Sequence, residues 1–167
     1  MIFKNLKKNH YINLIIVIFI FTLDRISKIY VLYLNDKYQD GEIFSSKFLN
    51  ISLIWNDGIA FGLLSFDQSY TYNALTFIIA AIIFILLIMI IKNEGLKQYS
   101  FLIIFSGAIG NLFDRVYYKA VPDFIDLHIN NFHWFIFNVS DIFITLGVIF
   151  MILIEIVSKD KPTKNYD

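Results

Sequence analysis

Long apolar stretches separated by polar segments dominate this chain of 167 residues. Four stretches are long enough to cross a bilayer as helices, because about 20 apolar residues span a hydrocarbon core of about 30 Å. They cover about residues 11–34, 73–91, 98–116 and 138–157. The pattern predicts an all-α membrane protein with four transmembrane helices, forming a single integral membrane domain over residues 1–167.

The first apolar stretch shares features with a secretory signal peptide, because lysines precede it and its apolar run ends at Leu23. The residues that follow, Asp24-Arg25-Ile26-Ser27-Lys28, lack the small side chains of a cleavage site. The apolar pattern then resumes at Ile29. A retained span therefore explains this stretch better than a cleaved one.

Basic residues are unevenly distributed between the segments that connect the predicted spans. One set of connections and ends contains Lys4, Lys7, Lys8, Lys92, Lys97, Lys159, Lys161 and Lys164. The opposite set contains only Lys37, Lys47 and Lys119, besides Arg115 at the end of the third span. Because cytoplasmic segments are enriched in Lys and Arg, we expect both termini in the cytoplasm. The loops at about 35–72 and 117–137 then face outward, which in a bacterium means the periplasm or the outer surface.

The two outer segments carry features of β-structure. Residues 48–55 partly alternate apolar and polar side chains and are rich in strand-forming types. Residues 130–137 are dense in aromatic side chains. We expect a small β-sheet in this loop region, lying at the membrane surface.

Composition agrees with a membrane protein and narrows the possible chemistry. The chain is 57% hydrophobic with a mean hydropathy of +0.63, more than the small core of a soluble domain of this size requires. Its formal net charge is zero, so no excess of positive charge is available for nucleic acid. Cysteine is absent, which excludes disulfides, zinc–thiolate sites and thiol nucleophiles.

Polar residues inside the first and third spans need partners, since unpaired charge is costly within a bilayer. Asp24 and Lys28 are four residues apart on one helical face, which favours a buried ion pair that holds the bundle together. In the third span, Gly107 and Gly110 allow another helix to approach closely. Asn111 and Asp114, with Arg115 next in sequence, place polar groups at the outer end of that contact.

The fourth span begins with Asn138, Asp141 and Thr145 on one face. Asp141 lies about one helical turn into the bilayer, where an ionised and unpaired carboxylate is expensive. It therefore needs a partner or a water-filled site. By itself, Asp141 is as consistent with a structural carboxylate as with a functional one.

The outer loops supply further polar residues at the same membrane face. Asp123 follows Pro122, which fixes the local chain direction. We expect Asp126 and the nearby His128 to be solvated loop residues. The segment Asn56-Asp57-Gly58-Ile59-Ala60-Phe61-Gly62 predicts a tight turn with a close backbone approach.

This outer face lacks an evident Ser-His or Cys-His constellation, and no set of side chains has clear metal-ligand spacing. We therefore expect neither a metal nor a cofactor. Asp123 and Asp141 remain the simplest catalytic pair. If they meet, they share one proton, and one acts as a base on water while the other protonates the substrate. Their spacing alone does not show that they meet.

Taken together, five motifs in order resemble those of bacterial lipoprotein signal peptidase, also called signal peptidase II. The resemblance covers about residues 20–145 and rests on Asp24-Arg25-Ile26-Ser27-Lys28, Asn56-Asp57-Gly58-Ile59-Ala60-Phe61-Gly62, Gly107-Ala108-Ile109-Gly110-Asn111-Leu112-Phe113-Asp114-Arg115, Val121-Pro122-Asp123-Phe124 and Phe137-Asn138-Val139-Ser140-Asp141. Ser106 and Ser140 depart from the family pattern, which often has glycine and alanine at these positions.

The resemblance implies a membrane aspartyl endopeptidase that cleaves prolipoproteins just before their lipid-modified cysteine. It implies a monomer whose partners are lipidated prolipoproteins and membrane lipids, without nucleic acid. The catalytic dyad it implies is Asp123 and Asp141. Substrate-binding or supporting positions are Asn56, Gly58, Asn111, Arg115 and Asn138, and structural polar positions are Asp24, Lys28 and Asp114.

Two other classes of function compete with a protease. A small proton-coupled transporter or channel subunit would use Asp24, Asp114 and Asp141 as relay groups, and predicts carboxylates spread through the bilayer. Here the carboxylates gather mostly at one face. A non-catalytic membrane scaffold leaves Asp141 and the Asn-Asp-Arg cluster of the third span unexplained.

Overall fold

The structure of the chain, a computed structural model, describes residues 2–38, 41–58 and 68–159. Residues 59–62 of the turn predicted above lie outside this range, as do Lys161 and Lys164. The side chains of Lys4, Lys7, Lys8 and Lys159, which contribute to the predicted orientation, are also outside the described part.

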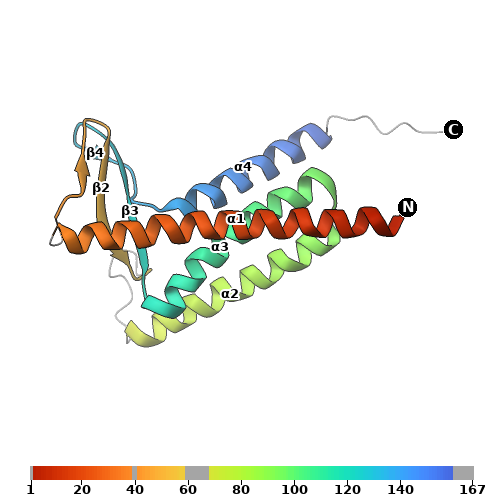
Figure 1. Cartoon of the computed structure of the whole chain (residues 1–167), viewed down its shortest axis with the longest axis horizontal. Helices are drawn as coiled ribbons and strands as arrows, with labels where there is room; N and C mark the ends of the chain where they lie inside the picture. The colour runs from red at the N-terminus through yellow and green to blue at the C-terminus, as the bar shows by residue number, and fades with distance from the viewer. Residues whose placement is uncertain (1, 39–40, 59–67, 160–167) are drawn as a thin grey trace.

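Four helices run back and forth along the long axis of the molecule (Figure 1). They are α1 (Ile2–Lys37), α2 (Gln68–Lys92), α3 (Gly95–Tyr118) and α4 (Val139–Lys159). The start of α1, the connection from α2 to α3 and the end of α4 lie at the end of the bundle opposite the sheet. The four predicted helices are confirmed; α1 begins nine residues before the apolar stretch that predicted it, whereas the start of α4 agrees to within one residue.

Neighbouring helices approach α3 most closely at two of its glycines, where there is no side chain to keep them apart. A Cβ added to Gly107 would come within 2.6 Å of the carbonyl oxygen of Ser140, and one added to Gly110 within 2.8 Å of Asp24 Oδ2. Helix α3 therefore packs against both α1 and α4 at these positions. This is the close helix approach that the two glycines predicted.

Four antiparallel strands form one sheet at the end of the bundle, in the order β1-β2-β3-β4. The predicted strand at residues 48–55 is confirmed as β2 (Leu49–Asn56), and β1 (Phe44–Ser45) pairs with it. The aromatic segment contributes β4 (Phe132–His133).

The longest strand, β3 (Val121–Ile129), was not anticipated, because these residues were assigned to the outer loop. Its second half, Ile125-Asp126-Leu127-His128-Ile129, alternates apolar and polar residues, which is the period of a strand. The prediction of solvated loop positions for Asp126 and His128 was wrong. Asp126 lies within the strand, is only 6% exposed, and its carboxylate contacts the ring of His133 on β4.

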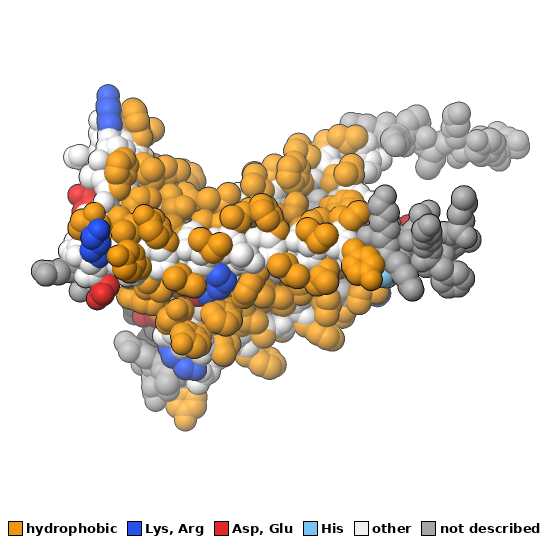
Figure 2. All heavy atoms as spheres, in the orientation of Figure 1, with side chains coloured by type: hydrophobic (Ala, Val, Ile, Leu, Met, Phe, Trp, Pro, Cys, Tyr) orange, Lys and Arg blue, Asp and Glu red, His pale blue; other side chains and the backbone are white. Residues whose placement is uncertain are grey.

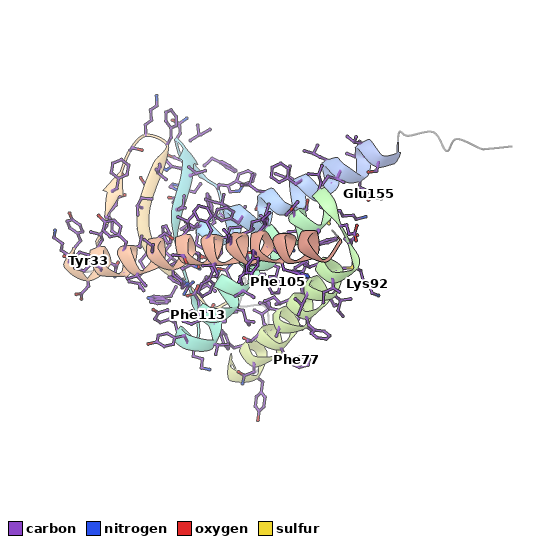
Figure 3. The ribbon with its side chains drawn as sticks, turned by 45° about the vertical axis from the view of Figure 1, so that its right-hand side comes forward. Tyr33, Phe77, Lys92, Phe105, Phe113 and Glu155 are labelled. Atoms are coloured by element: carbon purple, nitrogen blue, oxygen red, sulfur yellow. The ribbon has the colours of Figure 1, made fainter. Side chains whose placement is uncertain are left out.

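The helical part is apolar on its outside (Figure 2). Large side chains such as Phe77 on α2, which is 75% exposed, point away from the bundle (Figure 3). The apolar core by contrast is small, and Ile90, Phe101 and Leu102 form a buried cluster within it. Soluble domains bury most of their large apolar side chains, whereas here these side chains are on the outside. Such a surface fits contact with lipid.

Two of the described helices are long and apolar enough to cross a membrane by length and composition. They are Tyr72–Lys92 within α2 and Val139–Ser158 within α4. Helices α1 and α3 do not meet this test, and both carry charged residues near their contact with each other, including Asp24, Lys28 and Asp114. The count of four spans is therefore not established by the helices themselves.

Candidate active site

A compact ion cluster joins α1 to α3. Lys28 is 1% exposed, and its Nζ donates to Asp24 on α1 and to Asp114 Oδ2 on α3, at 2.9 and 2.6 Å. Arg25 also pairs with both carboxylates. Asp24 and Asp114 are each 0% exposed. Two cations and two anions thus neutralise one another in the bundle interior.

The ion cluster extends toward α4 through two hydrogen bonds. The backbone N–H of Ser140, in the first turn of α4, donates to Asp24 Oδ1 at 3.1 Å. Lys28 Nζ donates to Asn111 Oδ1 at 2.9 Å. The amide of Asn111 points its other end at Asp141, donating from Nδ2 to Oδ1 at 2.8 Å. The cluster therefore orients the amide that contacts Asp141.

Asp141 is also held by the cap of its own helix. The backbone N–H of Asn138 donates to Asp141 Oδ2 at 3.1 Å, and the backbone N–H of Asp141 donates to Asn138 Oδ1 at 3.2 Å. This reciprocal pair is a capping box with an aspartate at the N3 position. The start of α4 therefore fixes the carboxylate of Asp141, which remains partly exposed.

Asp123, on β3, accepts hydrogen bonds from two side-chain amides. Asn56 Nδ2 on β2 donates to its Oδ2 at 2.8 Å, and Asn138 Nδ2 donates to its Oδ1 at 2.6 Å. Asp123 is buried, with only 3% of its surface exposed. Burial raises the pKa of Asp123 above its ordinary value of 3.8, against the lowering effect of the Asn138 and Asn56 hydrogen bonds.

Asn138 connects the two aspartates. Its side chain binds Asp123 through Nδ2, while its backbone N–H binds Asp141. Repulsion from the Asp141 carboxylate further raises the pKa of Asp123, so the two acids lie near enough to interact. The structure thus gathers five of the sequence-predicted residues into one site: Asp123, Asp141, Asn56, Asn111 and Asn138.

Gly58 and Arg115 lie beside this site and do not contact the carboxylates through any hydrogen bond described. The N–H of Gly58 donates to Asn56 Oδ1 at 2.8 Å, which helps to aim the amide of Asn56. Gly58 has a φ of 79°, and a Cβ there would collide with Leu75. Arg115 reaches toward Gly58, and within the described residues its buried Nε has no hydrogen-bond partner.

An apolar cavity of about 550 Å³ opens next to Asp141. It lies between α4 and the strands β3 and β4, and Asp141 is the single carboxylate among its lining residues. Those residues are Phe48, Leu127, His128, Ile129, Phe132, Trp134, Phe135, Phe137, Asp141, Ile142, Thr145 and Leu146. The site therefore combines an acidic pair with an adjoining apolar space.

Arg25 lies between Asp24 and Lys28 in the sequence but was not predicted to belong to the ion cluster. A second group that was not predicted is formed by Asp126, His128 and His133, in which His133 Nδ1 lies 2.8 Å from Asp126 Oδ2. The alternation of β3 was the signal available for this group, because it puts Asp126 and His128 on the same side of the strand.

The family model and the most similar proteins all point to the same protein family. The model of the signal peptidase II family matches residues 16–157. The chain is 49% identical over 156 residues to the lipoprotein signal peptidase of Pelagibacter ubique, covering 93% of this chain and 94% of that protein. It is 35% identical over 139 residues to the lipoprotein signal peptidase of Francisella tularensis subsp. novicida, covering 80% and 86%.

Solved structures agree with this relationship. A bacterial membrane enzyme determined by the in meso method at 2.3 Å superposes with a TM-score of 0.70 at 29% identity, over 93% of this chain and 94% of that chain. A second, at 1.9 Å, gives a TM-score of 0.69 at 31% identity, over 89% and 94%. The match of sequence and fold over nearly the whole length means that the chain belongs to the signal peptidase II family, the lipoprotein signal peptidases.

Proposed function

We propose that this chain is an aspartic endopeptidase that removes the signal peptide from prolipoproteins, cutting just before a diacylglyceryl-modified cysteine. Asp123 and Asp141 are its catalytic pair. One observation carries this proposal: in a member of the signal peptidase II family, Asn138 binds both carboxylates, and one of them, Asp141, lines an apolar cavity.

The chemistry of the pair follows from its neutral surroundings. Each carboxylate accepts hydrogen bonds from amides, so no cation neutralises it directly and the pair retains one proton between them. The ionised member takes a proton from water as the water oxygen adds to the scissile carbonyl carbon. The protonated member donates to the carbonyl oxygen. Collapse of the tetrahedral intermediate breaks the C–N bond, and the leaving amine takes up a proton from the pair.

The three asparagines position this pair. Asn56 and Asn138 hold Asp123 from two sides, and Asn111 holds Asp141. Gly58 and Arg115 border the site and complete the substrate-binding surface. Asp24, Lys28 and Asp114 support it structurally, since Lys28 also fixes the orientation of Asn111.

The apolar cavity explains why the proposed substrate carries a lipid. A diacylglyceryl cysteine is anchored in the outer leaflet, and the cavity offers aliphatic and aromatic walls directly beside Asp141. Lipid and peptide would meet the acidic pair at the depth of the first turn of α4. No second copy is needed to complete the site, which supports a monomeric enzyme working with membrane lipids.

We also propose that all four helices span the inner membrane, with both termini in the cytoplasm. The four charged side chains of the ion cluster between α1 and α3 pair with one another and sum to zero, so they are not left unpaired in lipid. Outward positions of α1 are apolar, as at Ile18 and Phe19, which are 55% and 58% exposed. Lys92 lies at the end of the bundle opposite the sheet (Figure 3), as the charge bias of cytoplasmic segments requires.

The topology can be tested with single cysteines, because the chain has none of its own. We expect Ser46→Cys, in the turn between β1 and β2, to react in intact cells with a maleimide that cannot cross the inner membrane. Ser158→Cys, near the end of α4, should react only after that membrane is permeabilised. Labelling of both variants in intact cells would contradict the proposed orientation.

The catalytic assignment is tested by Asp123→Asn and Asp141→Asn in purified enzyme. Each variant keeps the size of the side chain and removes its proton chemistry, so we expect cleavage to fall by roughly 10²–10⁴-fold or more. The measurement is the gel shift of a lipidated prolipoprotein in detergent. Asp36→Asn, an exposed aspartate at the outer end of α1, is the matched control. Normal cleavage by either site variant would disprove the dyad.

The lipid requirement needs its own assay. We expect the same prolipoprotein to be cleaved much more slowly when its cysteine lacks the diacylglyceryl group, because the cavity then contributes no binding. Equal kcat/KM values for the two substrates would remove the proposed role of the cavity without affecting the assignment of the dyad.

A further inference from the structure

The hairpin of β3 and β4 brings three potential metal ligands to one face of the sheet. Asp126 and His128 are two residues apart on β3, so their side chains point to the same side. His133 on β4 is the direct cross-strand partner of His128. The tight turn between the strands, with Asn130 at a φ of 52°, fixes this register.

Contacts within this group leave one polar atom unexplained. His133 Nδ1 lies 2.8 Å from Asp126 Oδ2, and the two imidazole rings stack with their centroids 5.0 Å apart. One ligand atom from each residue can be chosen so that all three lie within 4.8 Å of one another. His128 Nδ1 is buried, and in the described part of the chain it has no hydrogen-bond partner. A buried ring nitrogen without a partner calls for a ligand.

This group is separate from the catalytic pair. Successive residues of a strand point to opposite faces, so Asp126 and His128 lie on the face opposite Asp123. The cross-strand neighbour of Asp126 is Asn50, whereas Asp123 lies beside Ile54. A ligand bound by Asp126 and the histidines therefore lies on the other face of β3 from Asp123, although His128 lines the same cavity as Asp141.

We propose that Asp126, His128 and His133 bind a divalent transition-metal ion, with Zn²⁺ as the best match. Two imidazole nitrogens and one carboxylate oxygen suit Zn²⁺, whereas Mg²⁺ and Ca²⁺ prefer oxygen ligands alone. Three protein ligands leave a further position for water. The His133 side chain is 52% exposed, so it has room to turn toward the ion and is reachable from the outer solution.

The position of this site gives the ion a structural role. It would link β3 to β4, whose short pairing consists of two residue pairs. His128 and Phe132 of this hairpin also line the apolar cavity beside Asp141. Metal binding therefore stabilises one wall of that cavity, without supplying any group to the cleavage reaction.

The test uses full-length enzyme in detergent, freed of metal by a chelator and of any affinity tag. We expect added Zn²⁺ to raise the midpoint of thermal unfolding, because an ion that binds only the folded state stabilises it. Co²⁺ in place of Zn²⁺ should give visible d–d absorption typical of low-coordinate nitrogen and oxygen ligation. Absence of both signals in the wild-type enzyme would overturn the proposal.

Variants assign the signals to these residues. His133→Ala removes an exposed ligand, and Asp126→Asn is nearly isosteric, so each should keep the fold while weakening Zn²⁺ binding by about 100-fold or more. The chain has three histidines, and the remaining one, His10 on α1, supplies the control His10→Ala. Unchanged Zn²⁺ affinity in His133→Ala and Asp126→Asn, or its loss in His10→Ala, would disprove the site whatever the outcome of the cleavage assays.

Discussion

Two pairs of aspartates lie within one region of this molecule and have opposite surroundings. Asp24 and Asp114 are each bonded to Lys28 and Arg25, so every negative charge meets a positive one. Asp123 and Asp141 instead accept hydrogen bonds from amides. Amides stabilise a carboxylate without neutralising it.

The difference supports the structural role proposed for one pair and the catalytic role proposed for the other. Asp24 and Asp114 are each paired with two cations inside the bundle. This argues against Asp24 and Asp114 as relay groups of a transporter. Asp123 and Asp141 accept hydrogen bonds from amides, which is compatible with the acid–base role proposed for them. The surroundings of each aspartate, more than its depth in the membrane, indicate its role.

The largest expected effect on stability comes from removing one of the two cations of the ion cluster. Lys28→Met keeps an unbranched side chain of similar length but leaves the cluster with an unbalanced buried carboxylate. We expect the free energy of unfolding to fall by about 3–5 kcal/mol. Thermal unfolding followed by tryptophan fluorescence measures this, with the exposed Lys47→Met as control. A wild-type midpoint for Lys28→Met would contradict the comparison of the two groups.

An intermediate effect is expected from Asn138→Ser. Serine still caps a helix, so α4 should lose at most about 1 kcal/mol of stability. The variant lacks the amide that donates to Asp123 Oδ1, and we expect kcat to fall by about 10–100-fold with little change in KM. Asn138→Ala, which loses both the cap and the amide, should be both slower and less stable. Full activity of Asn138→Ser would show that the amide is dispensable.

A smaller effect is expected on the pH dependence of stability. The pKa of Asp123 is raised by burial, so the folded state favours its protonated form. Its contribution to stability is present below the ordinary value of 3.8 and is lost as the pH rises through the raised value. We therefore expect Asp123→Asn to gain stability relative to the wild-type enzyme as the pH increases from about 3.8. If the midpoints of thermal unfolding of the two proteins change in parallel with pH, the prediction is wrong.

The smallest effect is expected at Ser140, which stands where the family usually has alanine. Its backbone N–H binds Asp24, but within the described residues its buried Oγ has no partner. Ser140→Ala should therefore change the free energy of unfolding by less than about 0.5 kcal/mol, or stabilise the protein slightly. Unfolding midpoints and cleavage rates equal to wild type within error are the expected readings. A marked loss of stability would mean that Oγ is bonded after all.

The sequence predicted the helices well, because long apolar stretches determine their own secondary structure in a membrane. It also indicated the Asp24–Lys28 contact, since residues four apart share a helical face. The glycines of α3 predicted close packing, and the structure has it at Gly107 and Gly110. In each case the information is local, within about one or two turns of one helix.

Features that depend on pairing between distant segments were not predictable in this way. The hydrogen bond from Asn56 to Asp123 joins residues 67 apart, and the one from Asn111 to Asp141 joins residues 30 apart. Only the family resemblance linked these positions beforehand. Strand β3 was missed because proline and scattered polar residues concealed its alternation, so the group around Asp126 was missed with it.

The register of β2 against β3 contains one extra residue. Ile51 pairs with Ile125 but Ile54 pairs with Asp123, so β2 advances three positions while β3 advances two. This bulge turns Asn56 to the face of Asp123, whereas Asn50 stays on the face of Asp126. The spacing of this segment therefore matters more than its composition. Natural or engineered variation between residues 51 and 54 should tolerate exchanges of side chains but not the gain or loss of a single residue, which would send the amide of Asn56 to the wrong side of the sheet.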